Sequence, residues 1–161
     1  MSTVCQKCDY VAILEESSVG CTPNRLKVLK IVGDSPSPLS ASEIYTTLRR
    51  SGSINRVTLY RILDIFVDGK IVDRISAGDR SFRYGLAANK NHPRHPHFYC
   101  TLCGSMECLN PESLPVDIQS FQKTFPSLIE KMEIRLDGIC KNCLRRGKIE
   151  ESRSDEAARR K

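Results

Sequence analysis

The 161-residue sequence contains no hydrophobic run that approaches the roughly 20 residues needed to cross a bilayer. Its first residues also lack the basic head, apolar stretch and small-residue cleavage site of a secretory signal. We therefore expect a cytoplasmic protein with no membrane partner. Because disulfides are rare in a reducing cytoplasm, the eight cysteines are expected to serve metal ligation first and redox chemistry second.

The features of an enzyme are missing as well. No set of residues suggests a nucleophile with a base and an orienting acid, and no H-x-E segment precedes the cysteine pairs as it does in zinc deaminases. A thioredoxin-like C-x2-C would need a βαβ context, which the sequence does not offer. We therefore predict that the protein is not an enzyme. The net charge of +6 suits a polyanionic partner, although a solvated basic face would give the same balance.

The first half of the chain shows the pattern of three short helices followed by a hairpin. Thr22-Pro23 is typical of a helix start, and Ser40 with Glu43 forms a capping box before a second helix. Apolar residues recur at helical spacing from about residue 55 to residue 68, which predicts a third helix. Residues 71–75 and 81–86 predict two paired strands. This order predicts a winged helix-turn-helix.

The composition changes near residue 90, which indicates two domains. Residues 87–94 are polar and rich in turn formers, and are expected to be a hinge between a winged-helix domain of residues 1–86 and a second domain of residues 95–146. The second domain is expected to combine short strands with a helix. Residues 147–161 are charged and are expected to be a disordered tail, with a frayed helix as the alternative. The predicted fold class is α+β, with an N-terminal winged helix and a small C-terminal α/β domain.

Two cysteine pairs, Cys100-x2-Cys103 and Cys140-x2-Cys143, are separated by 36 residues. Each turn directs two sulfurs toward one point, and two such turns complete the tetrahedron that zinc prefers. Four thiolates leave no open position for water, so the predicted site is structural. The alternative is that these are four unrelated buried or redox cysteines.

The segment just before Cys100 contains two of the three histidines of the chain, His95 and His97. In a strand, residues i and i+2 point to the same face, so both imidazoles can bind one ion. The offset of three residues from His97 would place the Cys100 sulfur on the opposite face. Two separate metal ions are therefore the economical interpretation. The alternative is that both histidines are exposed polar residues at a domain edge.

Four features occur together in the sequence: the run RVTLYRIL, the hairpin, H-P-H-x2-C-x2-C-G and the late G-x-C-x2-C. In this combination the chain resembles the ferric uptake regulator (Fur) family of metal-dependent repressors, over about residues 12–146. The resemblance implies a DNA-binding winged helix, a hinge, and a dimerisation domain with a four-cysteine structural zinc. It implies a homodimer that binds double-stranded DNA, with a metal ion as corepressor. It also places sensory metal ligands at His95 and His97.

The sequence departs from the family pattern where iron- or peroxide-sensing members usually have a further histidine and a glutamate, which are Pro38 and Gly85 here. Cys108 stands where a carboxylate ligand is common. Thiolate with imidazole favours zinc, as in the zinc uptake regulator (Zur) branch, with iron as the alternative regulatory metal. Further donors would come from His92 or from the cysteines at positions 5, 8 and 21.

The third helix offers polar and aromatic side chains to the major groove, namely Asn55, Arg56, Thr58, Tyr60 and Arg61. The resemblance assigns the main base contacts to Tyr60 and Arg56. Further candidates for phosphate contacts are Arg25, Arg74, Arg80 and Arg83. The expected function is a repressor of metal-uptake genes that binds inverted repeats, with zinc as the favoured signal. The alternatives are an iron- or peroxide-responsive regulator and a constitutive DNA-binding protein with structural zinc alone.

Overall fold

The computed structural model describes residues 8–52, 54–77, 81–115, 117–129 and 132–147. Cys5, Arg80 and the tail from residue 148 onward lie outside the described residues, so the predicted disorder of the tail stays a prediction. Among the helices that are described, none is both long and apolar enough to cross a membrane.

Four helices make up most of the N-terminal part: α1 (Tyr10–Glu16), α2 (Pro23–Gly33), α3 (Ala41–Ser51) and α4 (Arg56–Asp68). Two of them begin at the predicted signals, and α4 begins at a cap that was not predicted. The Thr22 hydroxyl accepts the Arg25 N–H, the Ser40 capping box is present in full, and Asn55 caps α4. Helix α1 is an addition to the prediction, and Leu14 anchors it in the core.

A three-stranded antiparallel sheet completes this part, in the order β1 (Leu39–Ser40), β3 (Phe82–Leu86), β2 (Val72–Ser76). We call the β2–β3 hairpin the wing. Its register places Asp73 directly opposite Gly85. The helices and this sheet enclose one apolar core, in which Leu29, Leu63 and Phe66 are fully buried. The predicted winged helix-turn-helix is therefore present.

The C-terminal part is a second three-stranded sheet, in the order β5 (Met106–Cys108), β4 (His97–Cys100), β6 (Arg135–Gly138). A 3-10 turn, η1 (Pro111–Ser113), and two short helices, α5 (Ile118–Thr124) and α6 (Lys141–Arg145), accompany it. Strands β4 and β5 are antiparallel, whereas β4 and β6 are parallel. Because β4 and β6 are parallel, their C-terminal ends lie side by side, which brings the two cysteine turns together.

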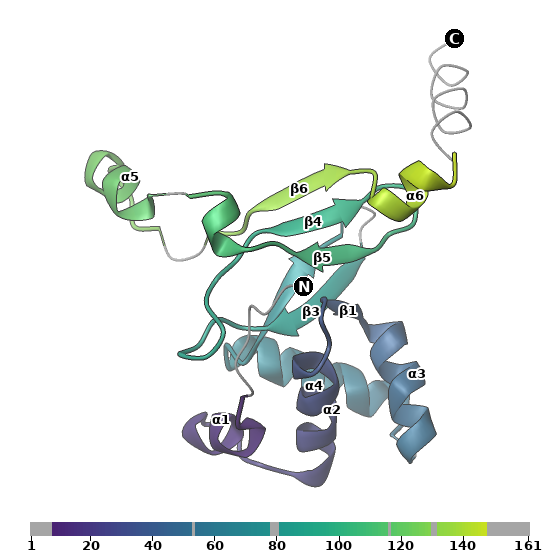
Figure 1. Cartoon of the computed structure of the whole chain (residues 1–161). Helices are drawn as coiled ribbons and strands as arrows, with labels where there is room; N and C mark the ends of the chain where they lie inside the picture. Colours follow the sequence, from purple (N-terminus) through teal and green to yellow (C-terminus); the bar gives the residue numbers. More distant parts are fainter. Residues whose placement is uncertain (1–7, 53, 78–80, 116, 130–131, 148–161) are drawn as a thin grey trace.

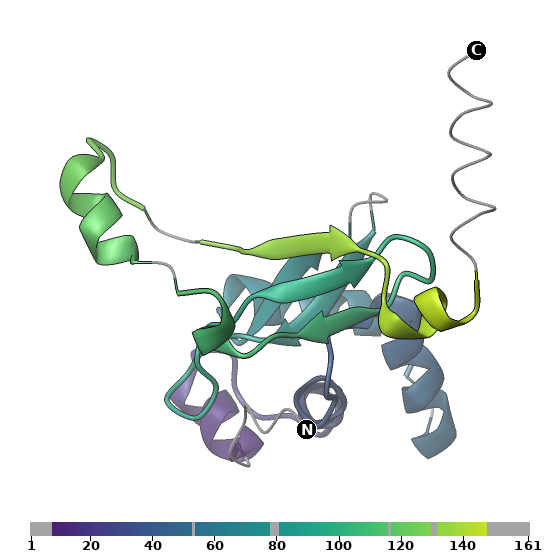
Figure 2. The same cartoon turned by 45° about the horizontal axis from the view of Figure 1, so that its top comes forward.

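The two sheets lie against each other, and the helices α2, α3 and α4 lie beyond the wing sheet on its far side (Figures 1 and 2). A small buried cluster joins the sheets: Ile75 and Ala77 of the wing side contact Tyr99 and Met106. Arg135 also donates to the Ser76 carbonyl at 2.6 Å. Helix α5 projects from the body as an arm (Figure 2). The mixed helix and sheet architecture confirms the predicted α+β fold class.

Candidate metal centres and DNA-binding helix

The four cysteines of the two C-x2-C turns form one cluster. Their sulfur atoms all lie within 4.8 Å of one another, and the Cys103 and Cys140 sulfurs are 3.7 Å apart. Zinc–sulfur bonds of about 2.3 Å in a tetrahedron place neighbouring sulfurs about 3.8 Å apart. Cys100, Cys140 and Cys143 are buried, whereas Cys103 is exposed. The spacing of the sulfurs therefore fits a tetrahedral zinc ion.

The surroundings of these sulfurs favour ionised thiols on one side of the cluster. Hydrogen bonds with Ser105 lower the pKa of Cys103 to about 6. Burial opposes ionisation of Cys100, but backbone amides that include Cys140 N–H outweigh it and lower its pKa. Burial and the neighbouring sulfurs raise the pKa of Cys143 to about 12. Four thiolates this close repel one another, so full ionisation requires a cation among them.

A second cluster consists of His95, His97 and Cys108, whose donor atoms also lie within 4.8 Å of one another. His97 faces Cys108 across the β4–β5 pair, which explains their proximity. The His95 Nδ1 lies 3.0 Å from the Pro93 carbonyl, an arrangement in which Nδ1 carries the proton and Nε2 presents its lone pair. His95 Nε2 and His97 Nδ1 are buried and have no hydrogen-bond partner in the described part of the chain.

Burial keeps the imidazoles of His97 and its neighbour His92 neutral. It lowers the pKa of His97 to about 4, with a further contribution from His95 and an opposing one from Asp73. Burial also lowers the pKa of His92, whose ring centroid lies 4.8 Å from that of His95. Neutral imidazole is the form that ligates metal ions, so no proton has to be removed from these rings at neutral pH.

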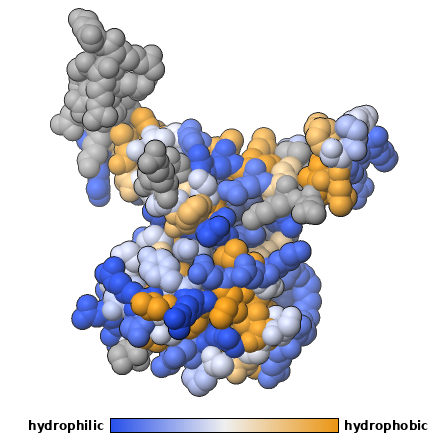
Figure 3. All heavy atoms as spheres, turned by 180° about the vertical axis from the view of Figure 1, so that it is seen from behind, coloured by the Kyte–Doolittle hydropathy of each residue, from blue (hydrophilic) through white to orange (hydrophobic). Residues whose placement is uncertain are grey.

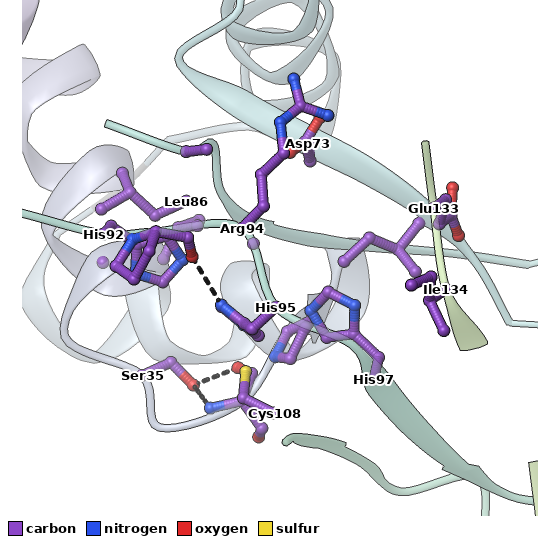
Figure 4. Close-up of a pocket in the computed structure, with 18 of the residues that line it drawn as sticks. Ser35, Asp73, Leu86, His92, Arg94, His95, His97, Cys108, Glu133 and Ile134 are labelled. Atoms are coloured by element: carbon purple, nitrogen blue, oxygen red, sulfur yellow. Dashed lines mark hydrogen bonds between the residues drawn. The ribbon is translucent and has the colours of Figure 1, made fainter. Parts of the chain in front are cut away.

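The second cluster opens into a cavity of about 130 Å³ between the two parts of the molecule, which we call the interdomain pocket. Figure 4 shows His92, His95 and His97 across this pocket, with Cys108 beside them and Asp73 on the wing. Pro38 and Gly85 line the same pocket, and a Cβ on Gly85 would lie 3.4 Å from the Pro38 ring. Both residues therefore lie beside the cluster without offering a side-chain donor.

Asp73 is an acidic residue of this pocket that the sequence did not indicate, and Glu133 is another. Asp73 lies on β2, lines the interdomain pocket, and acts electrostatically on both His92 and His97. The signal is the hairpin register, because Asp73 faces Gly85 in the paired strands. In contrast, the structure does not place Cys8 or Cys21 in either cluster: Cys8 packs in the helical core and Cys21 is exposed.

Helix α4 presents an exposed face with three of the predicted DNA-binding residues, Arg56, Tyr60 and Arg61. The Tyr60 side chain is 49% exposed, although it is a large aromatic residue. The Arg56 guanidinium lies 4.9 Å from the centre of the Tyr45 ring of α3, a cation–π contact that orients it. Asn55 and Thr58 form the helix cap, in which the Asn55 side-chain oxygen accepts the Thr58 N–H at 2.7 Å. That oxygen is therefore already engaged within the protein.

The wing arginines differ in orientation. Arg74 is exposed and stacks on Phe82, with its guanidinium 4.6 Å from the ring centre. The Arg83 side chain is only 16% exposed and contacts Glu43 and the Gly104 carbonyl. The predicted phosphate contact is therefore wrong for Arg83, because its guanidinium points into the molecule.

A winged helix with an exposed recognition helix, joined to a small sheet domain with two clusters of metal donors, defines a class of metal-responsive DNA-binding regulators. The sequence model of the ferric uptake regulator family matches residues 16–135, and the chain belongs to this family. It is a metal-responsive transcriptional regulator, since members of the family are regulators rather than enzymes.

Two sequence relatives and one solved structure illustrate the similarity. The chain is 27% identical over 132 residues to the ferric uptake regulation protein of Bacillus subtilis (strain 168), covering 81% of this chain and 89% of that protein. It is 28% identical over 140 residues to the peroxide-responsive repressor PerR of Staphylococcus epidermidis (strain ATCC 12228 / FDA PCI 1200), covering 86% and 91%. The Vibrio cholerae ferric uptake regulator matches with a TM-score of 0.64 and 24% identity, over 82% of this chain and 100% of that chain. That likeness concerns the fold.

Proposed function

We propose that the chain is a zinc-responsive repressor that binds inverted-repeat operators of metal-uptake genes as a homodimer. Residues 1–86 bind DNA, residues 87–94 act as a hinge, and residues 95–146 form the dimerisation domain. The observation that carries the proposal is the second cluster. Two buried imidazole nitrogens without a hydrogen-bond partner in the described part of the chain meet a thiol at the junction of the two domains.

Zinc is supported by the chemistry of the donors. Two imidazoles and one thiolate are ligands that zinc accepts in tetrahedral sites, whereas ions such as manganese prefer oxygen-rich sites. Pro38 and Gly85 contribute no side-chain donor. Asp73 lines the pocket from the wing, but it lies outside the group of donors within 4.8 Å of one another, so it would supply a fourth ligand only by moving toward the bound ion. His92, whose ring contacts His95, is the alternative fourth donor.

The proposed switch follows from the origin of the donors. His95, His97 and Cys108 belong to the C-terminal part, whereas Asp73 belongs to the wing. Shared ligation therefore favours the orientation in which the two parts meet. To shift the ratio of this orientation to all others from 1:99 to 99:1, the ion must bind this orientation about 5.5 kcal/mol more tightly than the others. Zinc sites of the four-ligand structural kind provide roughly 10 to 16 kcal/mol in peptides. Only the share of this energy that depends on the wing ligand is differential, so that ligand has to supply the shift.

The four-cysteine cluster is proposed to hold structural zinc through Cys100, Cys103, Cys140 and Cys143. It would fasten the start of α6 to the end of β4, in a domain whose described core is small. When zinc is bound it keeps all four sulfurs ionised. The protein supplies the amide and hydroxyl hydrogen bonds that stabilise these charges on Cys100 and Cys103.

The homodimer is supported by the apolar surface of the C-terminal part. The α5 arm exposes Phe121, Phe125 and Leu128, with Leu128 81% exposed, and Figure 3 shows apolar side chains gathered on this arm. Strand β6 is an edge strand and exposes Leu136. Apolar residues gathered in this way are typical of surfaces that a second chain covers. A dimer places two α4 helices against the two halves of an inverted repeat.

The test is a DNA-binding titration with the purified full-length protein. Duplex sites are first selected from a random-sequence library, and the affinity is then measured by fluorescence anisotropy as buffered zinc or ferrous iron is raised. We expect two zinc ions per chain and tighter binding with zinc. The Cys108→Ser variant should weaken the zinc response by at least about tenfold, an energy of about 1.4 kcal/mol. Cys21→Ser is the matched control, because Cys21 is exposed and lies outside both clusters.

Two outcomes contradict the proposal. A single zinc per chain with DNA affinity that does not depend on metal identifies a constitutive DNA-binding protein. Tighter binding with ferrous iron alone shows that the zinc assignment is wrong and that the chain is an iron-responsive regulator.

A further inference from the structure

Arg83 connects the four-cysteine cluster to the DNA-binding domain. It lies on strand β3 of the wing, and its Nη2 group donates to the carbonyl of Gly104 in the first cysteine turn. Its Nη1 group lies 3.1 Å from the Glu43 carboxylate of helix α3 and 3.5 Å from the Pro38 carbonyl. One side chain of the wing thus contacts two segments that are far apart in the sequence, residues 38–43 and the first cysteine turn.

The contact with Glu43 reaches the start of helix α3. The same carboxylate oxygen of Glu43 accepts the Ser40 backbone N–H and the Ser40 hydroxyl, both at 2.7 Å. These bonds form one half of the capping box, and the Glu43 N–H completes it by donating to the Ser40 hydroxyl oxygen. Burial opposes ionisation of Glu43, but the bonds from Ser40 and the charge of Arg83 lower its pKa. A continuous series of hydrogen bonds therefore runs from Gly104 to the first turn of α3.

The position of the Gly104 carbonyl depends on the cysteine turn. Gly104 directly follows Cys103, adopts a left-handed conformation with φ +69°, and donates its N–H to the Cys100 carbonyl at 2.9 Å. Only glycine adopts this conformation at no steric cost. Ligation of Cys100 and Cys103 by one ion would hold this turn closed, so the acceptor of Arg83 is in place only while the turn is intact.

Arg83 depends in return on its partners. Its side chain is largely enclosed, and its Nε group is buried with no hydrogen-bond partner in the described residues. A largely enclosed guanidinium that loses one of its few acceptors is destabilised, even though the Glu43 and Pro38 oxygens stay. Loss of the Gly104 carbonyl would therefore make Arg83 move, and Glu43 and the α3 cap would lose a partner.

We propose that Arg83 is a positioning residue through which the four-cysteine site holds the start of α3, so that the integrity of this site affects the orientation of the DNA-binding helices. Helix α3 contacts α4 directly, since Tyr45 lies against Arg56. The four-cysteine site thus has a second role besides stabilising its own domain. The proposal rests on the proposed function for the identity of the metal and the role of α4, but the link through Arg83 is tested without DNA.

The experiment perturbs one end of this link and measures the other. Hydrogen exchange of the Ser40 and Glu43 amides is followed by mass spectrometry in the full-length protein, before and after a strong chelator removes the metal from the four-cysteine site. In the wild type we expect exchange at these amides to accelerate by about tenfold, the factor that corresponds to about 1.4 kcal/mol. In Arg83→Gln, exchange should already be fast, and metal removal should add nothing.

A second measurement uses fully metallated protein, so that it holds even if the C-terminal part unfolds without metal. Arg74→Gln is the matched control, because it removes the same charge from the same hairpin, while the Arg74 side chain is exposed and its guanidinium stacks on Phe82. Arg83→Gln should accelerate exchange at the start of α3, and Arg74→Gln should leave it unchanged. The proposal is overturned if metal removal leaves these amides protected in the wild type, if it accelerates them equally in wild type and Arg83→Gln, or if the two arginine variants behave alike. Because no DNA is present, failure of zinc sensing would not change these results.

Discussion

The buried imidazole of His97 predicts a specific dependence of stability on pH. Its pKa is lowered to about 4, whereas an unfolded histidine titrates near 6.5. The unfolded chain therefore binds a proton at this residue more readily than the folded protein does. The free energy of unfolding therefore falls as the pH is lowered from about 6.5 toward 4, and it is restored above 6.5.

The magnitude can be worked out from the two pKa values. A residue with these values contributes about 2 kcal/mol less stability at pH 5 than at pH 7. His97 is half-buried rather than fully enclosed, so solvent screening reduces the expected loss to about 1 to 2 kcal/mol. The loss belongs to protein whose second cluster holds no metal, since a bound ion competes with the proton for the same nitrogen.

The assay is urea unfolding followed by circular dichroism at pH 7, 6 and 5, at one fixed protein concentration and with a chelator that empties the second cluster. The control is His97→Asn, which keeps a polar side chain but does not titrate in this range. The wild type should lose about 1 to 2 kcal/mol more than the variant between pH 7 and pH 5. Parallel pH profiles for the two proteins would refute the reasoning, because they would mean that His97 titrates normally.

Three further predictions concern the other sites. Cys140→Ser should release one zinc per chain, measured with a chromophoric chelator, and should lower the melting temperature of the C-terminal part; retention of that zinc would contradict the four-cysteine site. Leu128→Glu should shift the protein from dimer to monomer in analytical ultracentrifugation, because it places a charge on the exposed apolar arm; an unchanged dimer would move the interface elsewhere. Arg61→Gln should reduce the slope of log affinity against log salt concentration by about one and weaken binding to all DNA sequences alike, because it removes a phosphate contact. Tyr60→Ala should instead weaken binding to selected DNA sites more than binding to random DNA.

Much of the fold follows from local signals in the sequence. The caps at Thr22, Ser40 and Asn55 determine where three helices begin, because each satisfies backbone N–H groups that the helix itself leaves open. Helix α1 gives a weaker signal, since seven residues are too few for a clear period and only Leu14 is buried. Strand β1 has two residues, which is too short for any alternation to appear.

The candidate sites depend more on contacts between distant residues. The C-x2-C spacing indicates the four-cysteine cluster because both halves are local, and the H-x-H spacing indicates two imidazoles on one face in the same way. Asp73 enters the interdomain pocket only through the register of the wing and the packing of the two sheets. The inward direction of Arg83 likewise depends on the cysteine turn that lies next to it in the folded protein. No local pattern specifies either placement.

The parallel pairing of β4 with β6 has a consequence for synthesis on the ribosome. His95, His97, Cys100, Cys103 and Cys108 leave the exit tunnel as one short stretch, well before Cys140 and Cys143 are translated. Zinc that binds the nascent chain at this stage encounters imidazoles and thiols of two future sites before β6 has paired with β4. An ion bound by a mixture of these donors has to be exchanged once the last strand has docked, whereas an ion bound by His95, His97 and Cys108 is already in its own site. The order of metal loading therefore depends on the topology as well as on the affinities.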